Sequence, residues 1–152
     1  MKRFPLLTYP YIRTDSDHTG AGFILQSPDQ SSILLIKDDR SMKWSFPKGR
    51  KESYDLTLIH TAVRECAEET GLYYGVDYTT VSSEVYTFGR TKHVFFLAKA
   101  YHTSLPPIKT TEHVVEIRYV PLTELEELDV NQYIRMWIAR KNDTTDSTDT
   151  ID

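Results

Sequence analysis

Four charged side chains close together in the sequence are the residues whose types and spacing could do chemistry: Arg64, Glu65, Glu68 and Glu69. An α-helix advances about 100° per residue, so measured from the arginine the glutamates fall near ~40° (Glu68), ~100° (Glu65) and ~140° (Glu69). Clustered carboxylates repel each other, and acids near the end of a helix oppose its macrodipole. A divalent cation would offset both costs, because Mg²⁺ prefers oxygen ligands and binds phosphates at the same time. The alternative is a solvated acidic face on which Arg64 is a local ion-pair partner.

The opposite side of the same predicted helix is apolar, and Gly71 is expected to end the helix. Its apolar arc is formed by Leu56, Ile59, Ala62, Val63, Cys66 and Ala67. One face is therefore expected to pack against the core while the other presents the carboxylates. Cys66 lies on the packing side and is interpreted as a small core residue rather than a nucleophile.

The segment from Gly49 to Leu72 resembles the signature of the Nudix hydrolases. That signature is Gly, five residues, Glu, seven residues, then Arg-Glu, an aliphatic residue, any residue, Glu-Glu, any residue, Gly and an aliphatic residue. The second half is matched by residues 64–72. The first half departs from the pattern, because Asp55 stands where the family usually has Glu and one extra residue separates it from Arg64. The lead-in is Pro47-Lys48-Gly49 rather than a double Gly.

The resemblance implies a hydrolase that uses Mg²⁺, with Mn²⁺ as an alternative. The metal ligands it implies are Glu65, Glu69 and Glu68, together with the carbonyl of Gly49. Arg64 is expected to orient the glutamates through charge-assisted hydrogen bonds. A metal-bound water would attack phosphorus, and the carboxylate that serves as general base is left open.

Nudix hydrolases often recruit a further Glu from a later strand, as a metal ligand or as the general base. The segment 112–120 reads as such a strand, and it contains Glu112 and Glu116. The expectation is that Glu112 supplies a metal ligand and Glu116 a catalytic carboxylate. The alternative for Glu116 is a solvent-facing strand residue.

Basic residues are concentrated just before the acidic helix. Lys48, Arg50 and Lys51 are the candidates for contact with substrate phosphates, and Arg90 in the predicted hairpin loop 89–92 is a fourth. An ordinary lysine-rich loop is the alternative interpretation.

The order of the predicted elements indicates an α/β fold. Strands are expected over 20–26, 32–37, 44–46, 79–88, 93–100 and 112–120. A short helix is expected from Pro121, and a terminal helix over 130–138 with Asp129 as its N-cap. The resemblance implies the Nudix α/β/α sandwich with a mixed β-sheet. The domain is expected to span residues 1–141, and the Thr/Asp/Ser-rich residues 142–152 are expected to be disordered.

Composition limits the function classes. The chain has 152 residues and a net charge of −4, which argues against a general nucleic-acid binder. A single cysteine excludes an internal disulfide and indicates a reducing compartment, so a cytoplasmic protein is expected. No stretch of the sequence is long and apolar enough to span a membrane.

The lead-in from Phe46 to Gly49 is similar to that of diadenosine tetraphosphate hydrolases and of mRNA-decapping Nudix enzymes. The resemblance thus implies cleavage of a phosphoanhydride bond in a nucleoside or dinucleoside polyphosphate, with RNA a less favoured partner than a small molecule. Diphosphoinositol polyphosphate or mRNA-cap hydrolysis is the alternative. A non-catalytic Nudix-fold module that senses a nucleotide or binds a protein is a second alternative of a different class.

Overall fold

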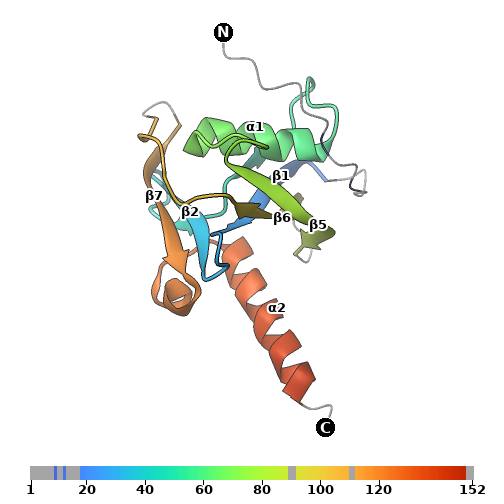
Figure 1. Ribbon diagram of the computed structural model, residues 1–152, viewed down its shortest axis with the longest axis vertical. Helices are drawn as coiled ribbons and strands as arrows, with labels where there is room; N and C mark the ends of the chain where they lie inside the picture. Colours follow the sequence, from blue (N-terminus) through green and yellow to red (C-terminus); the bar gives the residue numbers. More distant parts are fainter. Residues whose placement is uncertain (1–8, 10–11, 13–17, 89–91, 110–111, 150–152) are drawn as a thin grey trace.

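The computed structural model describes residues 9, 12, 18–88, 92–109 and 112–149, the last six of them by their backbone alone. Four strands precede the first α-helix and three follow it, and a 3₁₀-helix and a second α-helix complete the described part of the chain (Figure 1). The strands are β1 Gly20–Gln26, β2 Ser32–Asp38, β3 Trp44–Ser45, β4 Lys48–Arg50, β5 Tyr78–Thr87, β6 His93–Ala100 and β7 Val114–Pro121. The helices are α1 Leu58–Thr70, the 3₁₀-helix η1 Leu122–Glu127 and α2 Gln132–Asp149.

All seven strands belong to one mixed sheet, in which β1 is the central strand. β1 runs parallel to β6 along its whole length and antiparallel to β2 and β4 at its two ends. The remaining neighbours, β5 beside β6 and both β3 and β7 beside β2, are antiparallel. The register Ala21↔Gly49 fixes β4 against the start of β1, so the backbone of Gly49 is held by the sheet.

The two α-helices cover opposite faces of this sheet (Figure 1). Phe23 and Phe96 point into the core under α1, whereas their neighbours Ile24 and Phe95 point into the core beside α2. This alternation is what a strand buried on both faces requires. The predicted α/β/α sandwich with a mixed sheet is confirmed.

α2 begins later and extends further than the sequence predicts. Its N-cap is Asn131, whose side-chain Oδ1 accepts the backbone N–H of Ile134 at 3.2 Å, so the assignment of Asp129 as N-cap is wrong. The helix also continues to Asp149, into the segment where composition predicts a disordered tail. Ile134 and Trp137 are buried and anchor the helix, and each residue added beyond them can close one further backbone hydrogen bond. The domain boundary at residue 141 stays a prediction.

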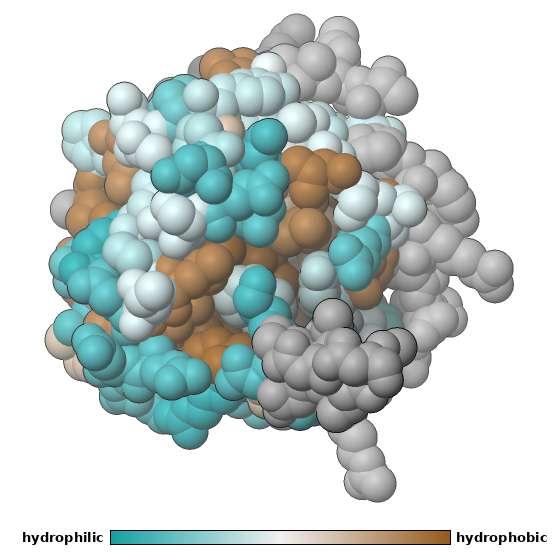
Figure 2. All heavy atoms as spheres, turned by 60° about the horizontal axis from the view of Figure 1, so that its bottom comes forward, coloured by the Kyte–Doolittle hydropathy of each residue, from teal (hydrophilic) through white to brown (hydrophobic). Residues whose placement is uncertain are grey.

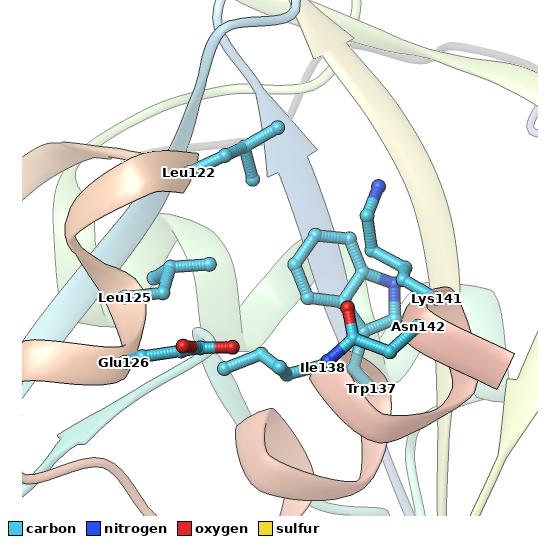
Figure 3. A pocket seen from close by; sticks show the side chains of 7 residues that line it. All are labelled: Leu122, Leu125, Glu126, Trp137, Ile138, Lys141 and Asn142. Atoms are coloured by element: carbon cyan, nitrogen blue, oxygen red, sulfur yellow. The ribbon is translucent and has the colours of Figure 1, made fainter. Parts of the chain in front are cut away.

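A small apolar pocket separates α2 from η1. Leu122 and Leu125 on one side face Trp137 and Ile138 on the other across about 90 Å³ (Figure 3). Figure 2, which brings the lower end of Figure 1 forward, shows apolar residues in a hollow on this side of the molecule, bordered by hydrophilic ones. Ligand sites usually have a volume of about 300–1,000 Å³. We therefore interpret this smaller pocket as a gap in the packing between the two helices.

No helix among the described residues is long and apolar enough to cross a membrane.

Candidate active site

α1 carries the acidic cluster, and its C-terminal end is capped and tied to a neighbouring loop. It begins at Leu58, and it stops at Gly71, which adopts a left-handed conformation with φ of 78°. Leu56, predicted for the apolar face, instead precedes the helix and is 83% exposed. The other predicted apolar residues of this helix are buried. In the last turn of the helix, Lys109 Nζ donates to the carbonyl oxygen of Ala67 at 3.0 Å, which ties the loop before β7 to the C-terminal end of α1.

Asp55 is a buried anchor for Arg64. Its carboxylate accepts hydrogen bonds from Arg64 Nε at 3.1 Å and Nη2 at 2.9 Å. The Thr61 hydroxyl and the backbone N–H of Glu52 donate to the same carboxylate, each at 2.9 Å. Burial raises the pKa of Asp55, but these hydrogen bonds, led by Arg64, outweigh it and hold the pKa below its ordinary value. The aspartate therefore stays ionised beside the guanidinium.

The one extra residue between Asp55 and Arg64 lengthens the loop before α1 and not the helix itself. Asp55 lies three positions before Leu58, so the insertion does not alter the helical spacing of residues 64–69. The short aspartate reaches Arg64 from this loop, and Leu56 turns to solvent. The departure from the family pattern thus changes how the arginine is reached and leaves the glutamates in register.

Arg64 positions two of the three helix glutamates. Its Nη1 donates to Glu65 Oε1 at 3.0 Å and to Glu68 Oε2 at 3.2 Å, while Nη2 also donates to the carbonyl oxygen of Arg50 at 2.9 Å. Burial disfavours the charged guanidinium, but Asp55, Glu65 and Glu68 outweigh it and raise the pKa of Arg64 above its ordinary value. One permanently charged group thus holds the carboxylates, as the sequence predicts.

Glu65 and Glu69 project from α1 onto the backbone of β4. A methyl group added at Gly49 would overlap the Glu65 carboxylate, so only glycine allows this close approach. Glu69 Oε1 accepts the backbone N–H of Lys48 at 2.8 Å. The strand and the helix therefore bring Gly49, Glu65 and Glu69 to one place.

The negative charge of the Glu65 and Glu69 carboxylates is only partly compensated by neighbouring donors and cations. Burial raises the pKa of Glu65 to about 7; Arg64 opposes the rise, and the charges of Glu68 and Glu112 add to it. Burial likewise raises the pKa of Glu69 to about 8, against the hydrogen bond from Lys48. Carboxyl groups with raised pKa values next to one another are typical of sites that bind a cation or a proton.

Glu112 and Glu116, the two glutamates predicted to join the site from a later strand, differ in position. Glu112 lies close enough to add its charge to the environments of Glu65 and Glu69. Glu116 pairs with Lys37 in the ladder between β2 and β7 and shares a sheet face with Val120, which packs in the core beside α2. The charge of Glu112 thus reaches the α1 carboxylates, whereas Glu116 lies on the opposite face of the sheet.

The basic candidates border an open pocket of about 590 Å³ next to β4. Arg50 and Lys51 line it, whereas Lys48 lies beside it with Nζ 5.6 Å from the centre of the Tyr133 ring. Arg90 lies outside the described residues. The pocket is completed by Thr19, Lys92, His93, Gln132 and Tyr133.

Sequence reasoning missed the part that α2 plays in this pocket. Gln132 and Tyr133 enter it because Trp44 of β3 bridges to Val130 just before the helix. The Tyr133 hydroxyl lies 3.2 Å from His93 Nδ1, joining α2 to the start of β6. No local pattern signals this contact, because it depends on which strand the helix start packs against.

The described residues contain no group of three or more His, Cys, Asp or Glu side chains already arranged around one point as metal ligands. Glu65 and Glu68 are turned toward Arg64, and Glu69 toward the backbone of Lys48. The donor set nevertheless suits a hard divalent cation, since it consists of carboxylate oxygens beside the peptide of Gly49. Its negative charge exceeds what one guanidinium neutralises.

The comparisons with known proteins agree with this geometry. The model of the NUDIX domain family matches residues 16–140. No curated protein matches the chain.

Solved structures with this fold are distant in sequence. A Nudix hydrolase from M. smegmatis, RenU, is 21% identical over 86% of this chain and 87% of its own, with a TM-score of 0.62. An Ap4A hydrolase from C. elegans is 16% identical over 81% of this chain and 96% of its own, with a TM-score of 0.61. The NUDIX domain of NrtR from Shewanella oneidensis, solved with ADP-ribose, is 16% identical over 85% of this chain and 90% of its own, with a TM-score of 0.57.

The matched family covers most of the chain, the fold is shared, and the arginine-held glutamates lie where its signature places them. The chain therefore belongs to the NUDIX domain family.

Proposed function

We propose that the protein is a magnesium-dependent pyrophosphohydrolase whose substrate is a nucleoside or dinucleoside polyphosphate. The observation that carries the proposal is the convergence of Glu65 and Glu69 on β4, where Gly49 has no side chain to block them. The basic pocket beside this strand supports a polyanionic substrate.

Glu65, Glu68 and Glu69, with the carbonyl of Gly49, would hold the metal, and Glu112, whose charge raises the pKa of Glu69, would be a further ligand. When bound, a divalent cation would neutralise charge on the phosphates and lower the pKa of an attacking water. Arg64 keeps Glu65 and Glu68 pointing the same way. Burial raises the pKa of Glu69 in the metal-free protein to about 8, and a bound cation would lower it again, so that the carboxylate is ionised as a ligand must be.

The test is hydrolysis of a substrate panel with Mg²⁺ and with Mn²⁺, followed by chromatography of the products. The panel holds diadenosine polyphosphates, nucleoside triphosphates, ADP-ribose, capped RNA and diphosphoinositol polyphosphates. We expect turnover of a nucleoside or dinucleoside polyphosphate that stops when the metal is removed with EDTA. Turnover of capped RNA alone, or binding of a nucleotide without hydrolysis of any panel member, would contradict the proposal.

A further inference from the structure

The C-terminal end of α1 carries charges that are unfavourable at a helix end. Glu68 and Glu69 lie in its last turn, which contains no basic residue. Acids at this end oppose the helix dipole, and the last carbonyl groups have no partner within the helix. Lys109, in the loop between β6 and β7, supplies both a cation and a donor, because its Nζ donates to the carbonyl oxygen of Ala67 at 3.0 Å.

The same loop contacts the helix end at a second point. A Cβ added at Gly71, the residue that ends α1, would lie 2.7 Å from Pro106 Cγ, so the loop approaches as closely as a glycine allows. Leu105, next to this proline, packs against the core under α1. The loop is thus held to α1 by a hydrogen bond and by close packing.

Glu112 lies between this attachment and another one. The carbonyl oxygen of His113, the next residue, accepts the backbone N–H of Asp39 at 2.8 Å, and its ring Nδ1 lies 3.1 Å from Asp39 Oδ1. On the other side, three residue steps can span at most about 11 Å from Lys109 to Glu112. The glutamate is therefore attached to α1 on one side and to the residue after β2 on the other.

The place of Glu112 depends on these attachments of its backbone. Among the described residues, its side chain has no hydrogen-bond or ion-pair partner of its own. Its negative charge is nevertheless one of the causes that raise the pKa of Glu65 and the pKa of Glu69. The attachments therefore keep the charge of Glu112 within reach of the α1 carboxylates.

We propose that Lys109 is a positioning residue of the active site, which holds Glu112 beside Glu65 and Glu69 by fixing the loop to the C-terminal end of α1. The lysine touches neither metal nor substrate and acts through the place of the glutamate. The assignment rests on the proposed function for the metal-binding role of the carboxylates, and it adds a residue from outside the segment 49–72. Loss of the attachment lowers the affinity of the site for a divalent cation.

Binding of Mn²⁺ to the metal-free protein, without substrate, tests this role separately from catalysis. The free ion is quantified during the titration by its electron paramagnetic resonance signal. Lys109→Met removes the charged donor, whereas Lys109→Arg keeps one. Lys99→Met is the matched control, because Ala98 and Ala100 face the core under α1 and the alternation of β6 places Lys99 on the opposite face of the sheet.

We expect Lys109→Met to weaken Mn²⁺ binding by about tenfold or more, the usual effect of removing a group that orients a metal ligand. Lys109→Arg should stay within about threefold and Lys99→Met within about twofold of the unmodified protein. In a Glu112→Gln background, Lys109→Met should change binding by less than about twofold, because the residue that it positions is gone.

A second variant loosens the loop without removing a charge. Pro106→Ala takes the proline ring away from Gly71 and should weaken Mn²⁺ binding in the same Glu112-dependent way. Circular dichroism verifies that each variant is folded at the temperature of the titration. If Lys109→Met does not fold, Pro106→Ala carries the test.

Mn²⁺ binding that is unchanged in these variants, or that falls equally with and without Glu112, would overturn the positioning role even if the enzyme hydrolyses anhydrides. Mn²⁺ binding that depends on Lys109 through Glu112, in a protein that hydrolyses no member of the substrate panel, would instead overturn the proposed function and leave the positioning role intact. Absence of Mn²⁺ binding by the unmodified protein would overturn both.

Discussion

At the scale of single residues, Asp55 determines whether Arg64 can hold the glutamates. The ion pair is buried, with 11% of the arginine side chain and 4% of the aspartate side chain exposed. Removing one partner of such a pair leaves an uncompensated charge and typically costs about 3–5 kcal/mol. We therefore expect Asp55 to act through Arg64.

We expect Asp55→Asn to lower the free energy of unfolding by about 3 kcal/mol and kcat by about tenfold or more, because Arg64 loses its anchor. Asp55→Glu should also lose activity, because the longer side chain moves the carboxylate within a buried site that now satisfies it with hydrogen bonds from Arg64, Thr61 and the backbone of Glu52. Urea denaturation and steady-state kinetics measure both effects, with Glu52→Gln as control because only the backbone of Glu52 contacts Asp55. Full activity in Asp55→Glu would contradict this account of Asp55.

The two later glutamates offer a second test. Glu112 lies near the α1 carboxylates and Glu116 on the other sheet face, so Glu112→Gln should weaken Mg²⁺-dependent activity by about tenfold or more. Glu116→Gln should stay within about twofold of the unmodified protein. Metal titration of the initial rate measures both. A larger loss of activity in Glu116→Gln than in Glu112→Gln would contradict the assignment of Glu112, and not Glu116, to the metal site.

At the scale of elements, α2 supports the strand that carries Gly49. Trp137 of α2 is 2% exposed, and its ring centre lies 5.9 Å from that of Phe46, nearly edge-on. Phe46 and Pro47 directly precede β4, which begins at Lys48. Packing on one face of the sheet therefore steadies the site on the other.

We expect Trp137→Ala to lower the free energy of unfolding by about 3–5 kcal/mol, the usual cost of removing a buried aromatic ring. Ile138→Ala on the same helix is the matched control, since Ile138 is only partly buried, and it should cost clearly less. Thermal unfolding followed by circular dichroism measures the difference. Equal effects of the two substitutions would show that the Trp137–Phe46 contact contributes little.

Elements with a strong local pattern could be predicted from the sequence, and those defined by tertiary pairing could not. The apolar strand Gly20–Gln26 and the Arg64–Gly71 spacing carry their own signals. β4 was missed because Pro47 reads as the end of a strand, and only pairing with β1 makes Lys48–Arg50 a strand. The carboxylates of the site were therefore predictable, whereas the contribution of Tyr133 depends on packing between distant segments.

At the scale of the whole molecule, the raised pKa values of Glu65 and Glu69 couple folding to pH and to metal. In the unfolded chain both groups titrate near 4.5, whereas in the fold their pKa values are about 7 and about 8. Between these values the folded protein holds protons that the unfolded chain has lost. Stability must therefore fall as pH rises through this window.

We expect the metal-free protein to lose about 2 kcal/mol or more of unfolding free energy between pH 5 and about 8.5, or roughly 4–8 °C in Tm. Saturating Mg²⁺ should restore much of this loss at the high-pH end, because a bound cation compensates the deprotonated carboxylates. Calorimetry across this pH range with EDTA or Mg²⁺ measures both. A metal-free stability that rises with pH, or no response to Mg²⁺, would contradict a cation site at these glutamates.

We propose that the carboxylates that α1 presents to β4 carry out metal-dependent anhydride hydrolysis. The most direct test is the rate of product formation by Glu69→Gln with saturating Mg²⁺, beside the unmodified protein and Glu127→Gln, an exposed glutamate remote in sequence from the cluster. We predict that Glu69→Gln loses at least about a thousandfold in kcat with its fold intact by circular dichroism, while Glu127→Gln is unchanged. Turnover by Glu69→Gln within about tenfold of the unmodified enzyme would contradict the account.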